Sequence, residues 1–284
     1  MPKRFVTLAW TAAASAYLLI VLGAVVRISG SGMGCGDHWP LCNGHLFPPL
    51  NDIPTVIEWS HRLVAAVVSL LVVGLALLGW RLRGSGSLEP GIRASYAAVV
   101  LLVIQVLLGA VTVKTGLTPV LVILHLATAM VLLASLIAAA RTPWLPTSGS
   151  WLPLSLAFIT VLFGALTANL GAMSSCGGFP LCNGQLIPTA GPLAWVQWIH
   201  RLLAYTLAGY LVWLVVREPR RAWPLLAIVA LQITIAATMI ALGFPSGLQV
   251  AHAGVGAAVW ASVLILATTP AAAAAASPPD QHRS

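Results

Sequence analysis

Charged side chains are scarce in this chain of 284 residues, because only 7% of them are Asp, Glu, Lys or Arg and 59% are hydrophobic. A soluble domain of ordinary composition carries about 25% charged residues. The chain therefore cannot cover a water-facing surface, which excludes a soluble enzyme and a disordered protein. The net charge of +8 does not indicate a nucleic-acid binder, because the cations separate apolar runs and form no patch. The composition predicts a membrane protein with several spans.

Eight apolar runs are long enough to cross a membrane as helices. A hydrocarbon layer about 30 Å thick needs roughly 20 apolar residues, since each residue of a helix adds about 1.5 Å. Asp, Glu, Lys and Arg are absent between Thr142 and His200, but Pro143, Pro146 and a long loop divide this stretch. The expected spans are 6–27, 56–80, 94–114, 120–140, 151–170, 195–216, 222–243 and 249–269.

The distribution of cations sets the expected orientation. The first run follows Lys3 and Arg4, as in a signal peptide, but from Phe5 to Val26 it is 22 residues long. A signal-peptide core has roughly 7–15 residues, so a retained helix is expected. By the positive-inside rule, we expect both termini in the cytoplasm of a plasma-membrane protein. The cations on the expected cytoplasmic side are Lys3, Arg4, Arg81, Arg83, Arg93, Arg141, Arg217, Arg220, Arg221 and Arg283.

Two strings of residues occur twice in the chain, in the same order. The string Trp39-Pro40-Leu41-Cys42-Asn43-Gly44 is matched by Phe179-Pro180-Leu181-Cys182-Asn183-Gly184. The string Glu58-Trp59-Ser60-His61-Arg62-Leu63 is matched by Gln197-Trp198-Ile199-His200-Arg201-Leu202. The offsets of 140 and 139 residues are near half the chain length, which indicates an internal repeat.

Each half of the repeat holds four spans, so both halves start on the same side of the membrane and the repeats are parallel. We expect an all-α integral membrane protein with eight transmembrane helices. They should form two four-helix bundles related by a pseudo-two-fold axis along the membrane normal. The expected parts are an N-terminal half over 1–145, a C-terminal half over 146–270 and a disordered cytoplasmic tail over 271–284.

Four histidines lie within the expected spans: His61, His125, His200 and His252. Ionisable side chains inside a membrane are costly and indicate a functional site. Each histidine lies one to two turns from the outer start of its span, and the repeat pairs His61 with His125 and His200 with His252. Two imidazoles that face each other in a four-helix bundle are typical of bis-histidine haem ligation. Zinc is the weaker alternative, because its sites favour additional Cys or carboxylate ligands.

The halves differ at one position near these histidines. Glu58 precedes His61 by three residues, whereas the second half has Gln197, which cannot exchange a proton at neutral pH. We expect a passive haem in the second half and a reactive site in the first, with Glu58 as the catalytic residue. The alternative for Glu58 is an ion pair with Arg62.

Three arginines lie at or near the outer ends of the spans. Arg27, Arg62 and Arg201 are candidates for binding haem propionates. For the two arginines that follow histidines, Arg62 and Arg201, the alternative is that their side chains reach out to the membrane interface.

All four cysteines lie in the two expected outer loops, 28–55 and 171–194. This location permits disulfides, and spacings of six and five intervening residues suit small closed loops. We expect the disulfides Cys35–Cys42 and Cys176–Cys182. The alternative is a metal loop that uses His38 and His45 with the first pair, but the second loop has no histidine.

Taken together, these features resemble the heme A synthase family over about residues 5–270. The Glu-x-x-His-Arg string alone would be a weak signal, but it occurs here with the duplication and both cysteine loops. The matching residues are Glu58-Trp59-Ser60-His61-Arg62, His125, the stretch from Gln197 to Arg201, His252, and Gly23-Ala24-Val25-Val26-Arg27 followed by Gly30-Ser31-Gly32.

The resemblance implies a membrane-bound oxidoreductase that acts on a CH3 group. It would oxidise the C8 methyl of heme O to a formyl group through successive hydroxylations and dehydration, giving heme A for terminal oxidases. The resemblance also implies a resident heme b ligated by His200 and His252, a transient heme O/A site at His61 and His125, and Glu58 as the essential carboxylate. It further implies the quinone pool as electron acceptor and a heme O synthase as donor of substrate. Membrane lipid would surround the chain, with no nucleic acid as a partner.

Two other functions explain part of the pattern. A dihaem cytochrome linked to quinone accounts for four histidines but gives the difference between Glu58 and Gln197 no role. A transporter with parallel repeats predicts broken helices and ionisable groups at mid-membrane, whereas here these groups lie near the outer face.

Overall fold

The computed structural model describes residues 2–49, 51–84, 86–142 and 151–268. Eight helices in this part of the chain are long and apolar enough to cross a membrane, and the same part holds no strand. The expected all-helical fold with eight spans is therefore confirmed. The expected tail over 271–284 and the expected boundary between 145 and 146 lie outside the described residues.

Each expected span coincides with one helix. Three short 3₁₀ turns accompany them: η1 (Ser31–Met33), η2 (Gly86–Leu88) and η3 (Ala172–Ser174). The helices are α1 (Pro2–Ile28), α2 (Ile53–Arg81), α3 (Glu89–Lys114), α4 (Pro119–Ala140), α5 (Trp151–Asn169), α6 (Pro192–Arg217), α7 (Pro219–Ala241) and α8 (Ser246–Ala267).

Most helices begin a few residues before the apolar run that predicted them. Proline occupies the first turn of α2, α3, α4, α6 and α7, where its missing N–H costs no hydrogen bond. At the start of α2, the side chain of Asp52 accepts hydrogen bonds from the hydroxyl of Thr55 at 2.6 Å and from its backbone N–H at 2.9 Å. These two bonds, the hydroxyl first, hold the pKa of Asp52 below its ordinary value.

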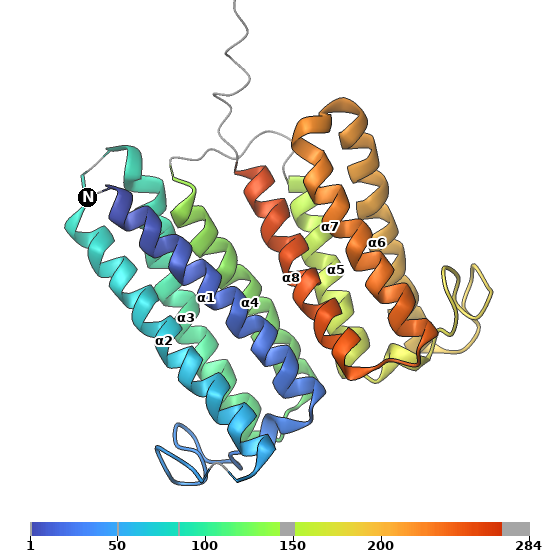
Figure 1. Cartoon of the computed structure of the whole chain (residues 1–284), viewed down its shortest axis with the longest axis horizontal. Coiled ribbons are helices and arrows are strands. Elements are labelled where there is room, and N and C mark those ends of the chain that lie inside the picture. The colour runs from blue at the N-terminus through green and yellow to red at the C-terminus, as the bar shows by residue number, and fades with distance from the viewer. Residues whose placement is uncertain (1, 50, 85, 143–150, 269–284) are drawn as a thin grey trace, which may run out of the picture.

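The helices pack in two groups of four (Figure 1). In the first group, α1 contacts α2 and α4, and α3 contacts the same two helices. In the second group, α5 contacts α6 and α8, and α7 contacts the same two. The pairs α2/α4 and α6/α8 are therefore the diagonals of their groups. The pseudo-two-fold axis between the groups stays a prediction.

Helices α1 and α4 of the first group join the second group through α8, and α4 also contacts α5. Hydrogen bonds from polar side chains cross this junction, and two of them come from Trp260 and Tyr17. The indole N–H of Trp260 donates to the carbonyl of Met130 at 2.9 Å, and the Tyr17 hydroxyl donates to the carbonyl of Gly254 at 3.1 Å. Because both bonds satisfy groups inside an apolar contact, they fix how the two groups lie against each other.

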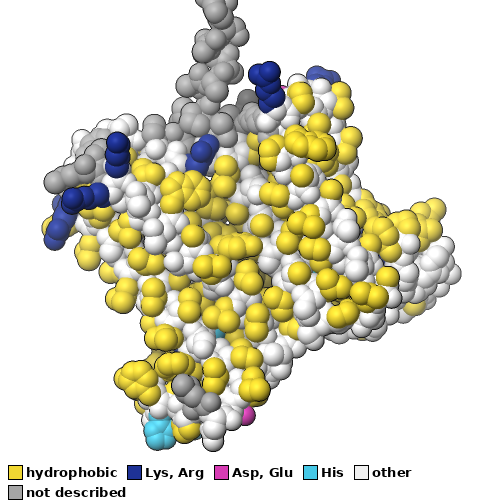
Figure 2. All heavy atoms as spheres, viewed as in Figure 1, with side chains coloured by type: hydrophobic (Ala, Val, Ile, Leu, Met, Phe, Trp, Pro, Cys, Tyr) yellow, Lys and Arg dark blue, Asp and Glu magenta, His cyan; other side chains and the backbone are white. Residues whose placement is uncertain are grey.

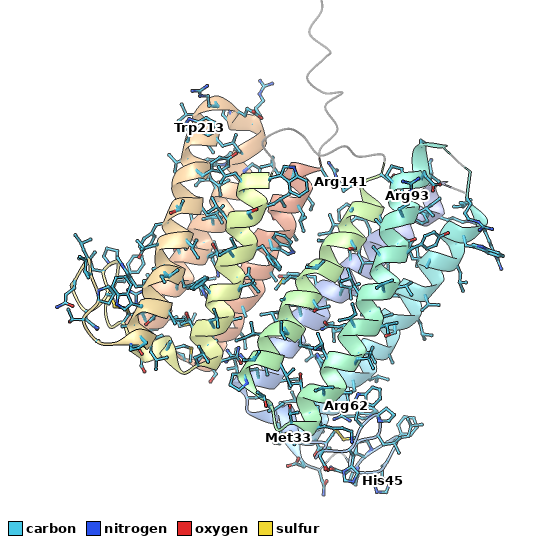
Figure 3. All side chains as sticks on the ribbon, turned by 180° about the vertical axis from the view of Figure 1, so that it is seen from behind. Met33, His45, Arg62, Arg93, Arg141 and Trp213 are labelled. Carbon is cyan, nitrogen blue, oxygen red and sulfur yellow. A yellow bond between two sulfur atoms is a disulfide. The ribbon has the colours of Figure 1, made fainter. Side chains whose placement is uncertain are left out.

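The surface separates apolar flanks from charged ends. Large apolar side chains such as Leu70 and Val216 are exposed on the flanks, as expected of helices that face lipid. Figure 2 shows the Lys and Arg side chains of one face gathered at a single end of the molecule. Arg93 and Arg141 lie at this end, and Arg62 lies at the opposite end (Figure 3). The assignment of the cation-rich end to the cytoplasm stays a prediction.

Candidate functional site

The four histidines of the spans lie at matching positions on the diagonal helices. His61 and His200 are each the ninth residue of their helices, α2 and α6. His125 and His252 are each the seventh residue of theirs, α4 and α8. At about 1.5 Å a residue, all four lie within about 9–12 Å of the helix starts, and thus at one depth.

In the second group, the structure brings His200 and His252 face to edge across the bundle. Their ring centroids are 6.3 Å apart, with an angle of 83° between the ring planes. A metal-bound imidazole nitrogen lies about 2 Å from its ion, so two rings on opposite sides of one ion have centroids about 6 Å apart. The donor set and its spacing therefore fit a pair of residues that would hold one haem iron between them. His61 and His125 occupy the equivalent diagonal in the first group.

The His200 ring is oriented by a hydrogen bond that the sequence did not reveal. Its Nδ1 lies 3.0 Å from the carbonyl oxygen of Thr160 on α5. A carbonyl can only accept, so Nδ1 carries the proton and Nε2 is left as the ligating atom. Among the described residues, no hydrogen bond reaches the His61 ring. The second pair is therefore more firmly oriented than the first.

Two glutamines contact the other two histidines. Gln105 on α3 places its Nε2 3.0 Å from Nε2 of His125. Gln232 on α7 places its Nε2 3.1 Å from Nδ1 of His252. Neither contact was predicted from the sequence. A usable signal was present, since each glutamine precedes its histidine by 20 residues.

Glycines on the neighbouring helices make room for three of the rings. A Cβ at Gly23 would lie 3.4 Å from Nε2 of His61, and a Cβ at Gly109 would lie 3.2 Å from Cε1 of His125. At Gly164 the added Cβ would lie only 3.0 Å from Cε1 of His200. Any side chain at Gly164 would push on the ring.

Glu58 and Gln197 have the same structural partner in the two halves. Oε2 of Glu58 accepts the backbone N–H of Cys35 at 2.8 Å, and Oε1 of Gln197 accepts the backbone N–H of Cys176 at 2.7 Å. Both side chains are buried. Each therefore ties the start of a cysteine loop to the helix that carries His61 or His200.

The arginines after the histidines hold the same loops. Arg62 forms the ion pair with Glu58 that the sequence offered as an alternative, at 2.5 Å, and also donates to the carbonyls of His38 and Leu41. Arg201 is only 6% exposed and donates to three carbonyls of the second cysteine loop. Among the described residues, Arg201 forms no ion pair with a carboxylate. The carbonyls that accept from Arg201 belong to Cys176, Gly178 and Leu181.

Arg27 lies at the edge between the groups. It ends α1 and donates to the carbonyl of Ala168 on α5 at 3.5 Å. The third candidate arginine thus lies where the two groups meet, at the end of α1 and close to the start of the loop that follows α5.

The cysteines pair as the sequence predicted. Cys35 bonds to Cys42 and Cys176 bonds to Cys182, with Cα atoms 4.4 and 4.6 Å apart. Thiols joined in disulfides are no longer available as metal ligands. No group of three His, Cys, Asp or Glu side chains that could hold a metal ion occurs in the described part of the chain. The first loop therefore offers no metal site there.

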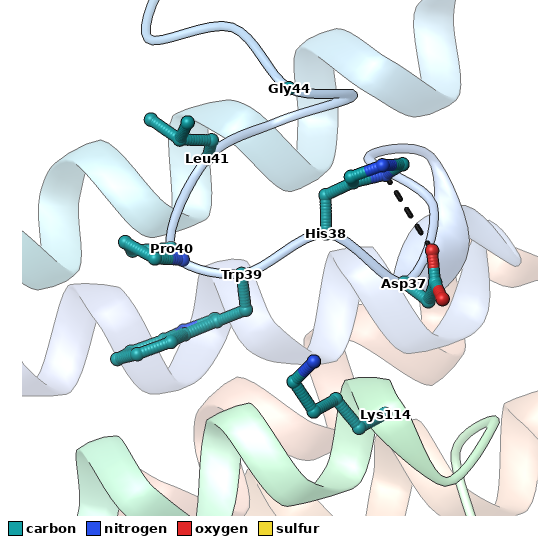
Figure 4. A pocket seen from close by; sticks show the side chains of 7 residues that line it. All are labelled: Asp37, His38, Trp39, Pro40, Leu41, Gly44 and Lys114. Carbon is teal, nitrogen blue, oxygen red and sulfur yellow. Dashed lines mark ion pairs between the residues drawn. The ribbon is translucent and has the colours of Figure 1, made fainter.

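A hollow of about 260 Å³ lies beside the first cysteine loop (Figure 4). Lys114, at the end of α3, extends toward the loop residues Trp39 and His38. The imidazole of His38 lies 3.6 Å from the carboxylate of Asp37. This hollow lies outside the helix groups and shares none of the four histidines of the spans.

A family model described as COX15-CtaA, cytochrome oxidase assembly protein, matches residues 6–264. The match covers all eight helices. The chain belongs to the COX15-CtaA family. The chain also resembles several proteins named "Heme A synthase" along most of its length.

Two such relatives and one other illustrate the similarity. The heme A synthase of Alkalihalophilus pseudofirmus is 31% identical over 216 residues, 70% of this chain and 72% of that protein. That of Bacillus licheniformis is 39% identical over 119 residues, 42% of this chain and 38% of that protein. A protein named protoheme IX farnesyltransferase, from Thermus thermophilus, is 32% identical over 299 residues, 94% of this chain and 48% of that protein.

Proposed function

We propose that this protein is a heme A synthase that oxidises the C8 methyl group of heme O to a formyl group, giving heme A. The observation that carries this proposal is that both helix groups have histidines at matching positions on their diagonal helices, whereas only the first group has a carboxylate, Glu58, at the position where the second has Gln197. The relatives named heme A synthase support the same activity. The reaction class is an oxidoreduction of a CH3 group.

The second helix group is proposed to hold a resident heme b between His200 and His252. The ring spacing of 6.3 Å and the bond from Nδ1 of His200 to Thr160 support this assignment. When bound, the haem would supply a one-electron relay between the reaction and the quinone pool. The protein's part is to fix the ligand planes and exclude water.

The first group is proposed to bind heme O and heme A in turn, between His61 and His125. A site that exchanges its haem needs looser ligands than a permanent one, and the His61 ring has no hydrogen bond within the described residues. Glu58 would accept protons released as the methyl group is oxidised in the successive hydroxylations, and the later dehydration would release water. Glu58 is buried, and its carboxylate contacts Arg62 and the N–H of Cys35.

The arginines are proposed to bind haem propionates with unequal strength. Arg201 is buried without a carboxylate partner in the described residues, so an anionic propionate would balance its charge. The charge of Arg62 is already balanced by Glu58. This difference favours permanent binding in the second group and exchange in the first. Arg27 lies at the junction of the two helix groups, where it would bind a propionate of the haem in either group.

The proposed partners follow from the substrate's chemistry. A heme O synthase would supply a farnesylated haem, and the Thermus relative supports this link, since about half of that farnesyltransferase matches this chain. The isoprenoid tail would lie among apolar flanks that face lipid. The proposed location is the plasma membrane with both termini in the cytoplasm, where the cation-rich end would lie.

Pigment analysis tests the proposed activity directly. Expressed in cells that make heme O but no heme A, the protein should convert extractable heme O into a haem with a formyl group, detected by mass and by its reduced pyridine spectrum. The matched control is the same strain without the protein. A purified protein that binds haem and leaves heme O unchanged would instead support the dihaem cytochrome.

The glycine opposite His200 gives a further prediction. Gly164→Ala should lower the content of resident haem severalfold, because its Cβ would press on the ring, and overpacking typically costs about 1–3 kcal/mol. Gly209→Ala on α6 is the control, since no atom lies within 4 Å of an added Cβ there. Haem per protein, measured optically, should fall in the first variant alone; equal values would contradict the proposed ring position.

A further inference from the structure

Each cysteine loop carries two adjacent apolar side chains that are largely exposed. They lie four and five residues after the second cysteine of the loop, at matching positions in the two halves. These apolar pairs are Leu46 with Phe47, which are 68% and 75% exposed, and Leu186 with Ile187, which are 72% and 69% exposed. Large apolar side chains exposed singly are normal on a protein surface, but here an exposed pair recurs in both loops. The apolar pairs therefore need a partner.

The stretches around the apolar pairs contain no charged residue. Asp, Glu, Lys and Arg are absent from 43–50 and from 183–191. A loop that faces only water consists mainly of polar residues. An uncharged loop with exposed Leu, Ile and Phe side chains instead fits the boundary between lipid headgroups and acyl chains.

The second cysteine loop turns back beside α6. The hydroxyl of Tyr205 donates to the carbonyl of Pro180 at 2.8 Å, and the rings of Tyr205 and Phe179 lie 6.2 Å apart. Tyr205 is the fourteenth residue of α6, about 20 Å from the helix start. Even with a side chain that points back toward this start, the contact lies roughly 12 Å along the helix. The loop therefore lies alongside α6 and does not extend it (Figure 1).

The first cysteine loop turns back in the same way beside α2. The indole N–H of Trp59 donates to the carbonyl of Leu46 at 3.0 Å, and the ring of Phe47 lies 6.1 Å from that of Trp59. Trp59 is the seventh residue of α2, so this apolar pair lies beside the first two turns of the helix. Figures 1 and 3 show both loops on the sides of α2 and α6 that are turned away from the other helix group.

The loops adjoin helix faces that already face lipid. Leu70 lies eleven residues after Trp59, and Val216 lies eleven residues after Tyr205. Eleven residues are about three turns, so each of these side chains shares a face with the residue that contacts a loop. Leu70 is 75% exposed and Val216 is 79% exposed. The surface of each apolar pair is thus continuous with the lipid-facing flank of a span.

We propose that both cysteine loops insert their apolar pairs into the membrane leaflet on their side, where the partner is lipid. The helix α6 has 26 residues and is about 39 Å long, against a hydrocarbon layer of about 30 Å. A contact roughly 12 Å along this helix lies at lipid depth. Trp59 and Tyr205 are aromatic residues of the kind that anchor a protein at this boundary. The inference requires only that the helices span a membrane, and it does not depend on the proposed activity.

The test is photolabelling of the purified full-length protein in nanodiscs of phosphatidylcholine. A small share of the lipid carries a diazirine near the carbonyl end of an acyl chain. After irradiation, protease digestion and mass spectrometry should find lipid adducts on both apolar pairs, at a level close to that of Leu70. Burial of one such side chain is favoured by about tenfold or more, so the adducts should exceed those on Ser87 by at least that factor. The control Ser87 is exposed in the turn between α2 and α3. Adducts on Leu70 with none above the Ser87 level on either pair would overturn the proposal and leave the pairs as a surface for another protein.

Two variants test whether the apolar pairs themselves insert. The charge of Phe47→Asp should expel the first pair from lipid, so its adducts should fall severalfold while those on the second loop of the same molecule stay unchanged. Ile187→Asp should give the reverse pattern. Unchanged adducts on the altered loop in both variants would also overturn the proposal. Should neither variant accumulate, the ratio of adducts on the pairs to adducts on Ser87 in the unaltered protein decides alone.

Discussion

Replacing Glu58 with glutamine is expected to lower formation of the formyl product by about 100-fold or more, while both proposed haem sites still bind haem. The carboxylate is the only group at this position that can take up protons, and an amide cannot. The measurement is conversion of heme O to heme A in membranes, together with the haem content of the purified variant.

The chain's second half shows why this variant should fold. Gln197 accepts the N–H of Cys176 as Glu58 accepts that of Cys35, so a glutamine fits the position. Arg201 also shows that a buried arginine can be held there by loop carbonyls alone. A loss of activity would therefore reflect the loss of the proton acceptor rather than disruption of the first cysteine loop.

Glu89→Gln is the matched control for this prediction. Glu89 also pairs with an arginine four residues on, Arg93, but at the cation-rich end and in an exposed position. It should retain full activity. Activity of Glu58→Gln equal to that control would remove Glu58 from the chemistry and leave it as a support of the cysteine loop.

The sequence predicted the eight spans well because apolar length alone determines them. It placed the starts of α2, α6 and α7 about three residues too late, since their first turns contain Pro54, Pro192 and Pro219. Proline there lowers apolar content without preventing a helix. The ends of apolar runs therefore only approximate the ends of helices.

His61, His200, Cys42 and Cys182 were predictable because they lie in strings that the chain repeats. The contacts of these residues were not. The bond between Glu58 and the N–H of Cys35 depends on the path of a loop, which composition does not define. Gln105 and Gln232 lie in stretches with no repeated string, and only their equal spacing from His125 and His252 connects them.

The role of the arginines also differs from what spacing alone suggests. The i,i+4 pair of Glu58 with Arg62 follows from helix geometry and is present. That both Arg62 and Arg201 donate to carbonyls of the cysteine loops could not be foreseen, because those carbonyls come from residues 20 or more positions away. Tertiary structure supplies these partners.

Removing either proposed haem ligand of the second group is expected to empty this group of haem. His200→Ala or His252→Ala should reduce the resident haem of the purified protein by more than about tenfold, since loss of a mere hydrogen-bond partner of a metal ligand already costs about tenfold to a hundredfold in affinity. The measurement is the optical spectrum and the haem-to-protein ratio.

His45→Ala is the matched control, because this histidine lies exposed in the first cysteine loop. His61→Ala and His125→Ala should keep the resident haem and lose binding of added heme O, which separates the two sites. Retention of the resident haem in both His200→Ala and His252→Ala, at the level of the control, would refute the second site. The rings of His200 and His252 lie 6.3 Å apart on diagonal helices. Another histidine of the spans could therefore take the place of either ring only if a helix moved.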